Sequence, residues 1–217
     1  MDLASVDHLL TTTRSVRKRL DMKRPVDLAV LETCIEIAFQ APTGSNAQGW
    51  HMLVVTDADK RAALAKLYKQ AFDMYRSMAE NAPQVQEGDP RREQTLRIID
   101  SAAYLTEHLQ EAPVHVIPCI EGRVESGPVV FQASMYGSIL PAVWSLMLAL
   151  RARGLGSAWT TLHLIHEKEA AALLGIPENI TQTALLPVAY FTGTDFKPAK
   201  RLPARDSTHW NTWGQRR

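Results

Sequence analysis

The segment Ala41-Pro42-Thr43-Gly44-Ser45-Asn46-Ala47-Gln48-Gly49-Trp50 lies between a helical pattern and a strand pattern. A simple connector needs glycine or proline in order to turn, but it does not need serine, asparagine and glutamine together. The segment offers backbone N–H groups, amide side chains and hydroxyls that suit a polar, planar ligand. A second unusual cluster, Arg14-Ser15-Val16-Arg17-Lys18-Arg19, lies earlier in the chain. Together the two segments predict a site for a phosphorylated cofactor with a hydrogen-bonding ring.

The composition indicates one domain, or one protomer of a tight dimer. The chain has 217 residues, of which 46% are hydrophobic, and its formal net charge of +1 gives no strong basic field that would favour nucleic acid or an anionic membrane. Cys34 and Cys119 lie in apolar stretches and match no zinc spacing, so we expect buried, reduced thiols in a cytoplasmic protein. The N-terminus shows no signal peptide pattern.

Residues 129–150 carry no charge and are long enough to span a bilayer. Polar and helix-weakening residues, among them Gln132, Gly137 and Pro141, interrupt the run. A helix that is apolar all round in a soluble protein lies in the core or in a subunit interface. We therefore expect a core or interface helix here, and no membrane span.

Helical and strand periodicities alternate along the chain, which predicts three layers around a small sheet. Asp27 is expected to cap a helix that Pro42 ends. The polar segment 81–90 reads either as a loop that covers an active site or as an ordinary connector. The further expected helices cover 3–20, 59–80, a stretch up to about 111, a long segment that ends at Gly154, and 167–174; the expected strands cover 51–56, 113–120, 155–161 and 183–192.

Four segments of the sequence resemble the nitroreductase family of flavoproteins. They are Arg-Ser-Val-Arg at 14–17, the segment 41–50 ahead of a strand, the helix-to-turn segment 148–157, and His-Trp-Asn-Thr-Trp at 209–213. They occur in the order and spacing of the family and extend over almost the whole chain. The resemblance implies an α+β, three-layer fold in which helices flank a small mixed β-sheet.

The same resemblance implies a single FMN-binding domain over 1–217 and an obligate homodimer, in which the tail 194–217 wraps the partner subunit. FMN would lie at each end of the interface and contact both chains. Arg14 and Ser15 match the phosphate and ribityl contacts, and Arg17 matches the basic residue near the pyrimidine edge of the flavin. The remaining assignments are the loop donated by the other subunit (Pro42, Thr43, Gly44, Ser45, Asn46), the amide of Gln48, the contacts towards flavin N5 (Thr160, Thr161) and the tail cation Arg201.

The chain departs from the family pattern at three places. Thr13 stands where many members have a first basic residue, Gly49 stands where proline usually precedes the tryptophan, and Ala158-Trp159-Thr160-Thr161 stands where classical members have an acidic residue near N5. Trp159 either shapes the pocket over the flavin or, as we expect, packs in the core. The threonine turn is shared with relatives that perform other flavin chemistry.

The sequence shows no convincing Ser-His-Asp, HExxH or paired-carboxylate motif, and no metal site is expected. Hydride transfer to and from flavin N5 needs no protein acid, base or nucleophile, because the cofactor carries the chemistry. A guanidinium at the N1–C2 carbonyl edge, which we assign to Arg17, favours the reduced anion. Gly154-Leu155-Gly156 follows a helix and lacks a third glycine, so it is not a dinucleotide fingerprint.

The leading hypothesis is an FMN-dependent oxidoreductase with a ping-pong cycle. NADH or NADPH and then a nitroaromatic, quinone or other conjugated acceptor would use the same pocket in turn. The threonine turn keeps open a reductive dehalogenase or a flavin-fragmenting enzyme of the same superfamily. A protein that stores or senses FMN without turnover is the alternative from another class.

Overall fold

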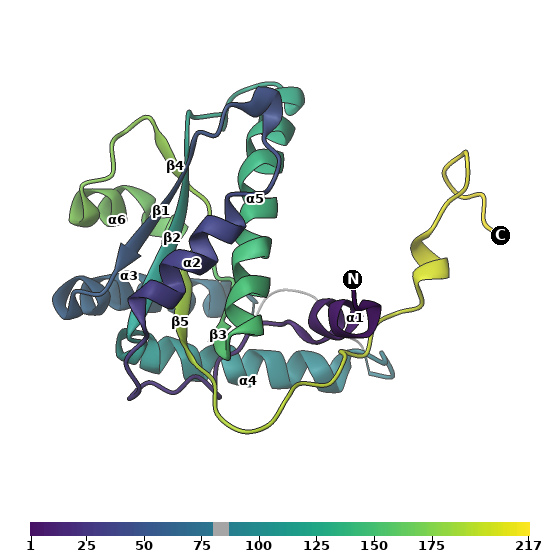
Figure 1. Ribbon diagram of the computed structural model, residues 1–217, viewed down its shortest axis with the longest axis horizontal. Helices are drawn as coiled ribbons and strands as arrows, with labels where there is room; N and C mark the ends of the chain where they lie inside the picture. Colours follow the sequence, from purple (N-terminus) through teal and green to yellow (C-terminus); the bar gives the residue numbers. More distant parts are fainter. Residues whose placement is uncertain (80–86) are drawn as a thin grey trace. The chain divides into compact units, whose positions relative to one another are not determined.

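An antiparallel β-sheet organises the larger of two units into which the structure divides. Figure 1 shows the computed structural model, which describes residues 1–79 and 87–217. The larger unit comprises residues 14–193, and the smaller unit comprises residues 1–13 together with 194–217. The prediction of one domain over 1–217 with a tail that wraps a partner stays a prediction.

The sheet contains five strands in the order β1-β2-β5-β3, with β4 paired to β2 beside this path. The pairings between these strands, as far as the chain is described, are all antiparallel. The α+β class is therefore confirmed, while the sheet of this chain is antiparallel where the resemblance implied a mixed one. The strands are β1 (Trp50–Val55), β2 (Val114–Glu121), β3 (Leu155–Ser157), β4 (Ile180–Gln182) and β5 (Leu186–Tyr190).

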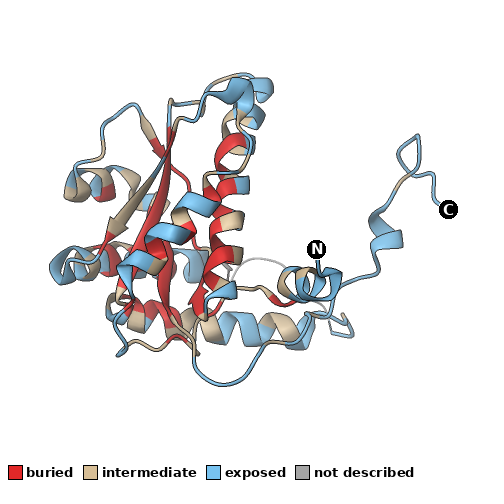
Figure 2. Cartoon of the chain, viewed as in Figure 1, coloured by how far each residue is buried: buried red, intermediate tan, exposed pale blue. Residues whose placement is uncertain are grey.

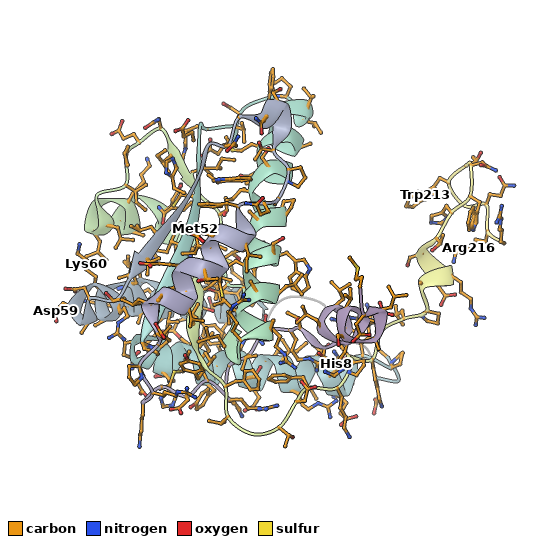
Figure 3. The ribbon with its side chains drawn as sticks, viewed as in Figure 1. His8, Met52, Asp59, Lys60, Trp213 and Arg216 are labelled. Carbon is orange, nitrogen blue, oxygen red and sulfur yellow. The ribbon has the colours of Figure 1, made fainter. Side chains whose placement is uncertain are left out.

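Helices cover both faces of the sheet, as expected of three layers. α2 (Leu28–Ala38) and α5 (Val129–Ala152) pack together on one face, where the main core includes Leu31, Val116 and Leu146. Met52 of β1 packs against this core (Figure 3). α3 (Ala58–Ala79), which packs against α4 (Arg92–His108), α6 (Glu167–Leu174) and the short helices η2 (Leu109–Glu111) and η3 (Leu162–His166), lies on the other face.

α5 has one buried face and one exposed face. Its buried residues include Ile139, Val143 and Leu146, and Figure 2 shows this face turned towards the sheet. Length and composition alone would let α5 cross a membrane, yet 44% of its most apolar window is buried inside the protein. The exposed positions recur at intervals of four and three residues, at Val130, Ser134, Gly137, Pro141 and Trp144. This stripe has the spacing of a helix–helix seam.

Most predicted elements of the larger unit are confirmed where local signals are strong. The Asp27 carboxylate accepts a hydrogen bond of 3.0 Å from the N–H of Ala29 and so caps α2. α6 begins at Glu167 and ends at Leu174, as predicted, and Gly175 closes it with a φ of 69°. The sequence reading missed β4, which lies just before the predicted strand 183–192. Residues 81–86 of the predicted loop lie outside the described residues.

The prediction of one helix over 3–20 is wrong. α1 covers Leu3–Thr12, and Thr13 leaves the helix with a ψ of 131°. Three consecutive threonines at 11–13 end it, and their hydroxyls bond to the preceding turn; that of Thr12 donates to His8 O at 2.7 Å. Such side chains compete with the helical hydrogen bonds of the backbone. The basic residues after Thr13 are therefore not on a helix.

The smaller unit contains α1 and the C-terminal tail. Within it, the imidazole of His8 contacts the carboxylate of Asp195. The tail forms the short helix η4 (Ala204–Ser207) and then an aromatic cluster, in which the His209 and Trp213 rings stack at 4.3 Å and Arg217 lies 3.8 Å from the Trp210 ring centre. Trp213 is nevertheless 88% exposed (Figure 3). An exposed tryptophan of this kind is typical of a surface that another protein covers.

Two histidines are completely buried beneath α3. The Nε2 atom of His115 lies 2.9 Å from the carbonyl of Leu109, whereas neither ring nitrogen of His163 has a hydrogen-bond partner among the described residues. Burial lowers the pKa of each imidazole to about 4, against an ordinary value of 6.5. Both side chains are therefore neutral in the folded protein at neutral pH.

These histidines predict that the protein loses stability as the pH falls from about 6.5 to about 4. In that window the unfolded chain binds protons that the folded chain excludes, and the loss is on the order of a few kcal/mol per histidine. Urea unfolding at a series of pH values measures the slope. His163→Gln should reduce the slope, because it removes one of the two buried imidazoles. An equal slope in the wild-type protein and in this variant would contradict the assignment.

Candidate functional site

The basic segment 14–20 runs beside β3. The N–H of Val16 donates to the carbonyl of Ser157 at 2.8 Å, and Leu20 forms a bridge with Phe191. Gly156 permits this close approach, because a Cβ at that position would lie 3.0 Å from the Cβ of Val16. Arg14 and Arg17 therefore do not lie on a helix, although the predicted helix over 3–20 included both of them. Backbone pairing with the sheet edge positions both residues instead.

Arg17 is a half-buried cation without a carboxylate partner in the described part of the chain. Its Nη1 atom lies 3.4 Å from the hydroxyl of Ser101 on α4. Burial lowers its pKa, and the neighbouring Tyr68 acts in the opposite direction. Its neighbour Lys18, by contrast, pairs with Asp100. A partly desolvated charge without a counter-ion is costly, so a bound anion is what this position favours.

The turn after β3 brings two threonines to the same region. Thr160 is buried, and both its N–H (3.1 Å) and its hydroxyl (2.7 Å) donate to the carbonyl of Leu185. Thr161 is exposed, and its hydroxyl bonds to no described residue. Sequence reasoning treated the two alike, but the donors of Thr160 are already used. Thr161 is the better candidate for a hydrogen bond to a ligand.

Tyr68 lies on α3, which packs against η3 directly after this turn. Its side chain is only 3% exposed. Burial raises its pKa, while the charge of Arg17 and a hydrogen bond with Thr160 oppose that rise. Tyr68 therefore lies within electrostatic range of Arg17 and of Thr160. Arg14 and Ser15, both half-buried, immediately precede this group in the chain.

The loop 42–48 is held in a strained conformation with its polar groups exposed. Ser45, Asn46 and Gln48 have φ angles of 53°, 53° and 52°, which non-glycine residues rarely adopt. The N–H of Gly44 donates to Ser138 of α5 at 2.9 Å, and the amide of Gln48 donates to Asn46 at 3.0 Å. Such strain persists only where surrounding contacts enforce it, and it concentrates at functional sites.

One chain does not bring the loop and the basic segment together. The loop packs on α5 at Ser138, whereas the basic segment packs on β3, which begins just after α5 ends at Ala152. Ser138 and Ala152 are 14 residues apart along α5. At a rise of 1.5 Å per residue, the two places are therefore about 21 Å apart. Figure 1 shows them at opposite ends of α5. Arg201 belongs to the smaller unit, and its role stays a prediction.

Residues 10–190 match the nitroreductase family. The chain belongs to this family. It is 29% identical over 186 residues to iodotyrosine deiodinase of Drosophila melanogaster. The matched region covers 84% of this chain but only 61% of the deiodinase. It is 26% identical over 208 residues to a putative NADH dehydrogenase/NAD(P)H nitroreductase of Archaeoglobus fulgidus. That matched region covers 94% of this chain and 97% of the relative.

The fold of this nitroreductase-family chain is similar to that of solved family structures. An iodotyrosine deiodinase bound to FMN and 3-iodo-L-tyrosine superimposes with a TM-score of 0.68 at 23% identity, over 93% of this chain and 96% of the other. Sequence reasoning named the exposed loop and the arginines as candidate site residues, and their roles stay predictions. It missed Tyr68, Ser101 and Ser138, because a polar residue at core spacing on a helix gives no functional signal by itself.

Trp159 has the structural role that we expected of it. It is half-buried and packs against the main core, which lies between the sheet and α2 and α5. Its neighbour Thr160 is bridged to Leu185, which immediately precedes the inner strand β5. The turn that follows β3 in this nitroreductase-family chain is therefore anchored by a packed indole before it and by a backbone bridge within it.

Proposed function

We propose that this protein is an FMN-dependent oxidoreductase that takes electrons from NADH or NADPH and passes them to a conjugated acceptor. The observation that carries the proposal is the half-buried guanidinium of Arg17, which lacks a carboxylate in the described chain and lies beside the Thr160–Thr161 turn. When bound, FMN supplies a ring that accepts and releases a hydride at N5. The chain's own residues bind and orient the reactants.

The residues of the site fit a flavin mononucleotide. Arg14 and Ser15 would hold the phosphate and the ribityl chain through charge-assisted and neutral hydrogen bonds. Arg17 would supply a fixed positive charge near the pyrimidine edge, which favours the electron-rich form. Thr161 offers its free hydroxyl towards N5. The FMN-bound deiodinase of similar fold supports this choice of cofactor.

A second copy of the chain completes the site. The exposed stripe of α5 is uncharged and includes Val130, 67% exposed, and Trp144, 38% exposed, which water does not favour. A two-fold pairing of this stripe in antiparallel sense places the start of one α5 next to the end of the other. The loop 42–48 of one protomer then approaches the basic segment of its partner. Gly44 lets the loop pack closely on α5 of its own protomer, because a Cβ there would lie 2.8 Å from the hydroxyl of Ser134.

The nicotinamide and the acceptor use the same place in turn, in a cytoplasmic homodimer. The name of the Archaeoglobus fulgidus relative supports NADH or NADPH as donor. The acceptor is a nitroaromatic, a quinone or another flat conjugated molecule. The chain excludes water from the turn by burying Thr160 and Tyr68, and it needs no acid or base for the hydride step.

Reductive dehalogenation is the second candidate, favoured by the deiodinase relative and by the exposed hydroxyl of Thr161. That reaction would replace a carbon–halogen bond by a carbon–hydrogen bond, with two electrons from bound, reduced FMN, one proton, and halide as the leaving group. Anaerobic incubation of the reduced protein with 3-iodotyrosine, followed by halide analysis, separates the two candidates. Iodide release without nitroaromatic reduction would select dehalogenation.

The direct test is whether the purified protein binds FMN and cycles. We expect flavin absorbance after reconstitution, bleaching by NADH or NADPH, and reoxidation by a small panel of nitroaromatics and quinones. A protein that cannot be reconstituted with FMN would refute the proposal. Bound FMN that neither nicotinamide reduces would select a storage or sensor role.

Two substitutions separate the roles of the arginines. Arg14→Ala should weaken FMN binding by roughly 1.5–3 kcal/mol, which is the cost of a charge-assisted hydrogen bond. Arg17→Ala should lower the flavin reduction potential more than it weakens FMN binding, because its charge favours the reduced form. Titration of the apoprotein with FMN and potentiometry measure the two effects. Equal effects of both variants on both quantities would contradict separate roles.

A charge within the α5 stripe should dissociate the dimer. Trp144→Glu places a carboxylate where a second α5 packs, so we expect a shift from dimer to monomer in sedimentation experiments and weaker FMN binding. Ile165→Glu is the matched control, because Ile165 is 50% exposed on η3, on the other side of the sheet. A Trp144→Glu protein that stays dimeric would show that the interface lies elsewhere.

A further inference from the structure

A cluster of buried polar side chains lies between the sheet and η3, on the face opposite the main core. The amide of Gln182 on β4 donates to the carbonyl of Glu167 at 3.0 Å, which places its side chain where η3 meets α6. Cys119 of β2 pairs with Gln182, and residues that pair in an antiparallel sheet point to the same face. Because side chains alternate along a strand, His115 shares this face with Cys119. His163 lies on η3, one helical turn before Glu167.

The cluster contains polar atoms that no described residue satisfies. Both ring nitrogens of His163, Nδ1 of His115 and Oε1 of Gln182 are enclosed and have no hydrogen-bond partner in the described part of the chain. His163 and His115 are completely buried, and Gln182 is 3% exposed. Unpaired buried polar atoms are costly, and in native proteins nearly all of them are paired with protein atoms or with ordered water. The cluster therefore needs a further partner.

The position and chemistry of the cluster restrict that partner. The atoms are enclosed within a single chain, so neither a second copy nor a molecule as large as FMN reaches them. Among the described residues, no group of three His, Cys, Asp or Glu side chains could hold a metal ion. The carboxylate of Glu167 is already bound by both terminal nitrogens of Arg123, at 2.7 and 2.9 Å. The partner that fits is a small neutral molecule that both donates and accepts hydrogen bonds.

We propose that ordered water fills this cluster and joins η3 to the sheet through hydrogen bonds with His163 and Gln182. A neutral imidazole has one N–H donor and one bare nitrogen, and the amide oxygen of Gln182 only accepts. Water accepts from the N–H and donates to the bare nitrogen or to the amide oxygen, so it matches all three atoms. Buried waters form about three hydrogen bonds each and occur about once per 27 residues, so a chain of 217 residues is expected to hold about eight.

Water at this place has a structural consequence for the Thr160–Thr161 turn. The turn leads directly into η3, and Glu167 at the far end of η3 is held by Gln182 and Arg123. The proposed water ties the middle of η3 to the sheet, so that the turn rests on a fixed support. It lies on the sheet side of η3 and is distinct from the bulk water that the buried Thr160 keeps out. The inference does not depend on bound flavin.

The alternative is a dry cluster whose polar atoms stay unpaired. In that case the unpaired nitrogens destabilise the folded protein, and an apolar side chain in place of His163 would remove their cost. In a hydrated cluster the same replacement breaks hydrogen bonds to water and leaves the water near Gln182 with one partner fewer. The two cases therefore differ in the sign of the change in stability.

A crystal structure of the purified protein, refined to a resolution at which single waters are visible, tests the proposal most directly. We expect at least one ordered water within about 2.7–3.2 Å of a His163 ring nitrogen and of Gln182 Oε1. In solution, NMR should show contacts between water and the ring protons of His163, and none to the methyl groups of Ile139, which is equally buried in the main core. A cluster without water, or one in which these side chains bond directly to other protein atoms, would overturn the proposal.

Two substitutions of similar size test the hydrogen bonds themselves. His163→Gln keeps a donor and an acceptor, whereas His163→Met has nearly the same length and shape without the amide. We expect the unfolding equilibrium constant of His163→Met to exceed that of His163→Gln by roughly tenfold, the effect of one lost hydrogen bond. Urea unfolding of the two variants measures the difference. A His163→Met protein that is as stable as His163→Gln, or more stable, would show that the cluster is dry.

Discussion

The long uncharged helix α5 is the constraint on which the rest of the structure depends. Its buried face forms much of the core against the sheet and α2, so its position is fixed. Its 24 residues are about 36 Å long, and the two halves of the candidate site lie near its opposite ends. A single chain cannot close a site of this geometry around one cofactor. In the proposed dimer, the exposed stripe between the two ends is the surface on which a second copy packs.

Local signals predicted much of the fold, and tertiary pairing decided the rest. α2 has an aspartate cap and α6 has a glycine stop, so both were predicted near their observed bounds. The end of α1 was not predictable, because residues 14–20 leave helical geometry in order to pair with β3 and Phe191. β4 was missed because three residues are too few for a periodicity. Its pairing with β2 makes it a strand.

The candidate site, like the fold, was predicted in part from local sequence signals, while the rest of it depends on tertiary contacts. The composition of 41–50 marked the loop, because amide and hydroxyl residues are unnecessary in a connector, and the structure adds that its backbone is strained. The arginines were found, but on the wrong secondary structure. Which of two adjacent threonines faces a ligand depends on a bridge to Leu185, which lies 25 residues further along the chain. No pattern within the turn contains that information.

The two arginine roles follow from one thermodynamic relation. If Arg17 stabilises the reduced flavin more than the oxidised flavin, then the protein must bind reduced flavin more tightly by the same free energy, because the coupling is reciprocal. Cofactor retention and reduction potential are therefore linked at Arg17. The phosphate that Arg14 would hold in the proposed site carries its charge in both redox states, so Arg14 would contribute to retention without this linkage. A site that places one arginine at each end of the cofactor can keep FMN bound throughout a cycle and still favour its reduction.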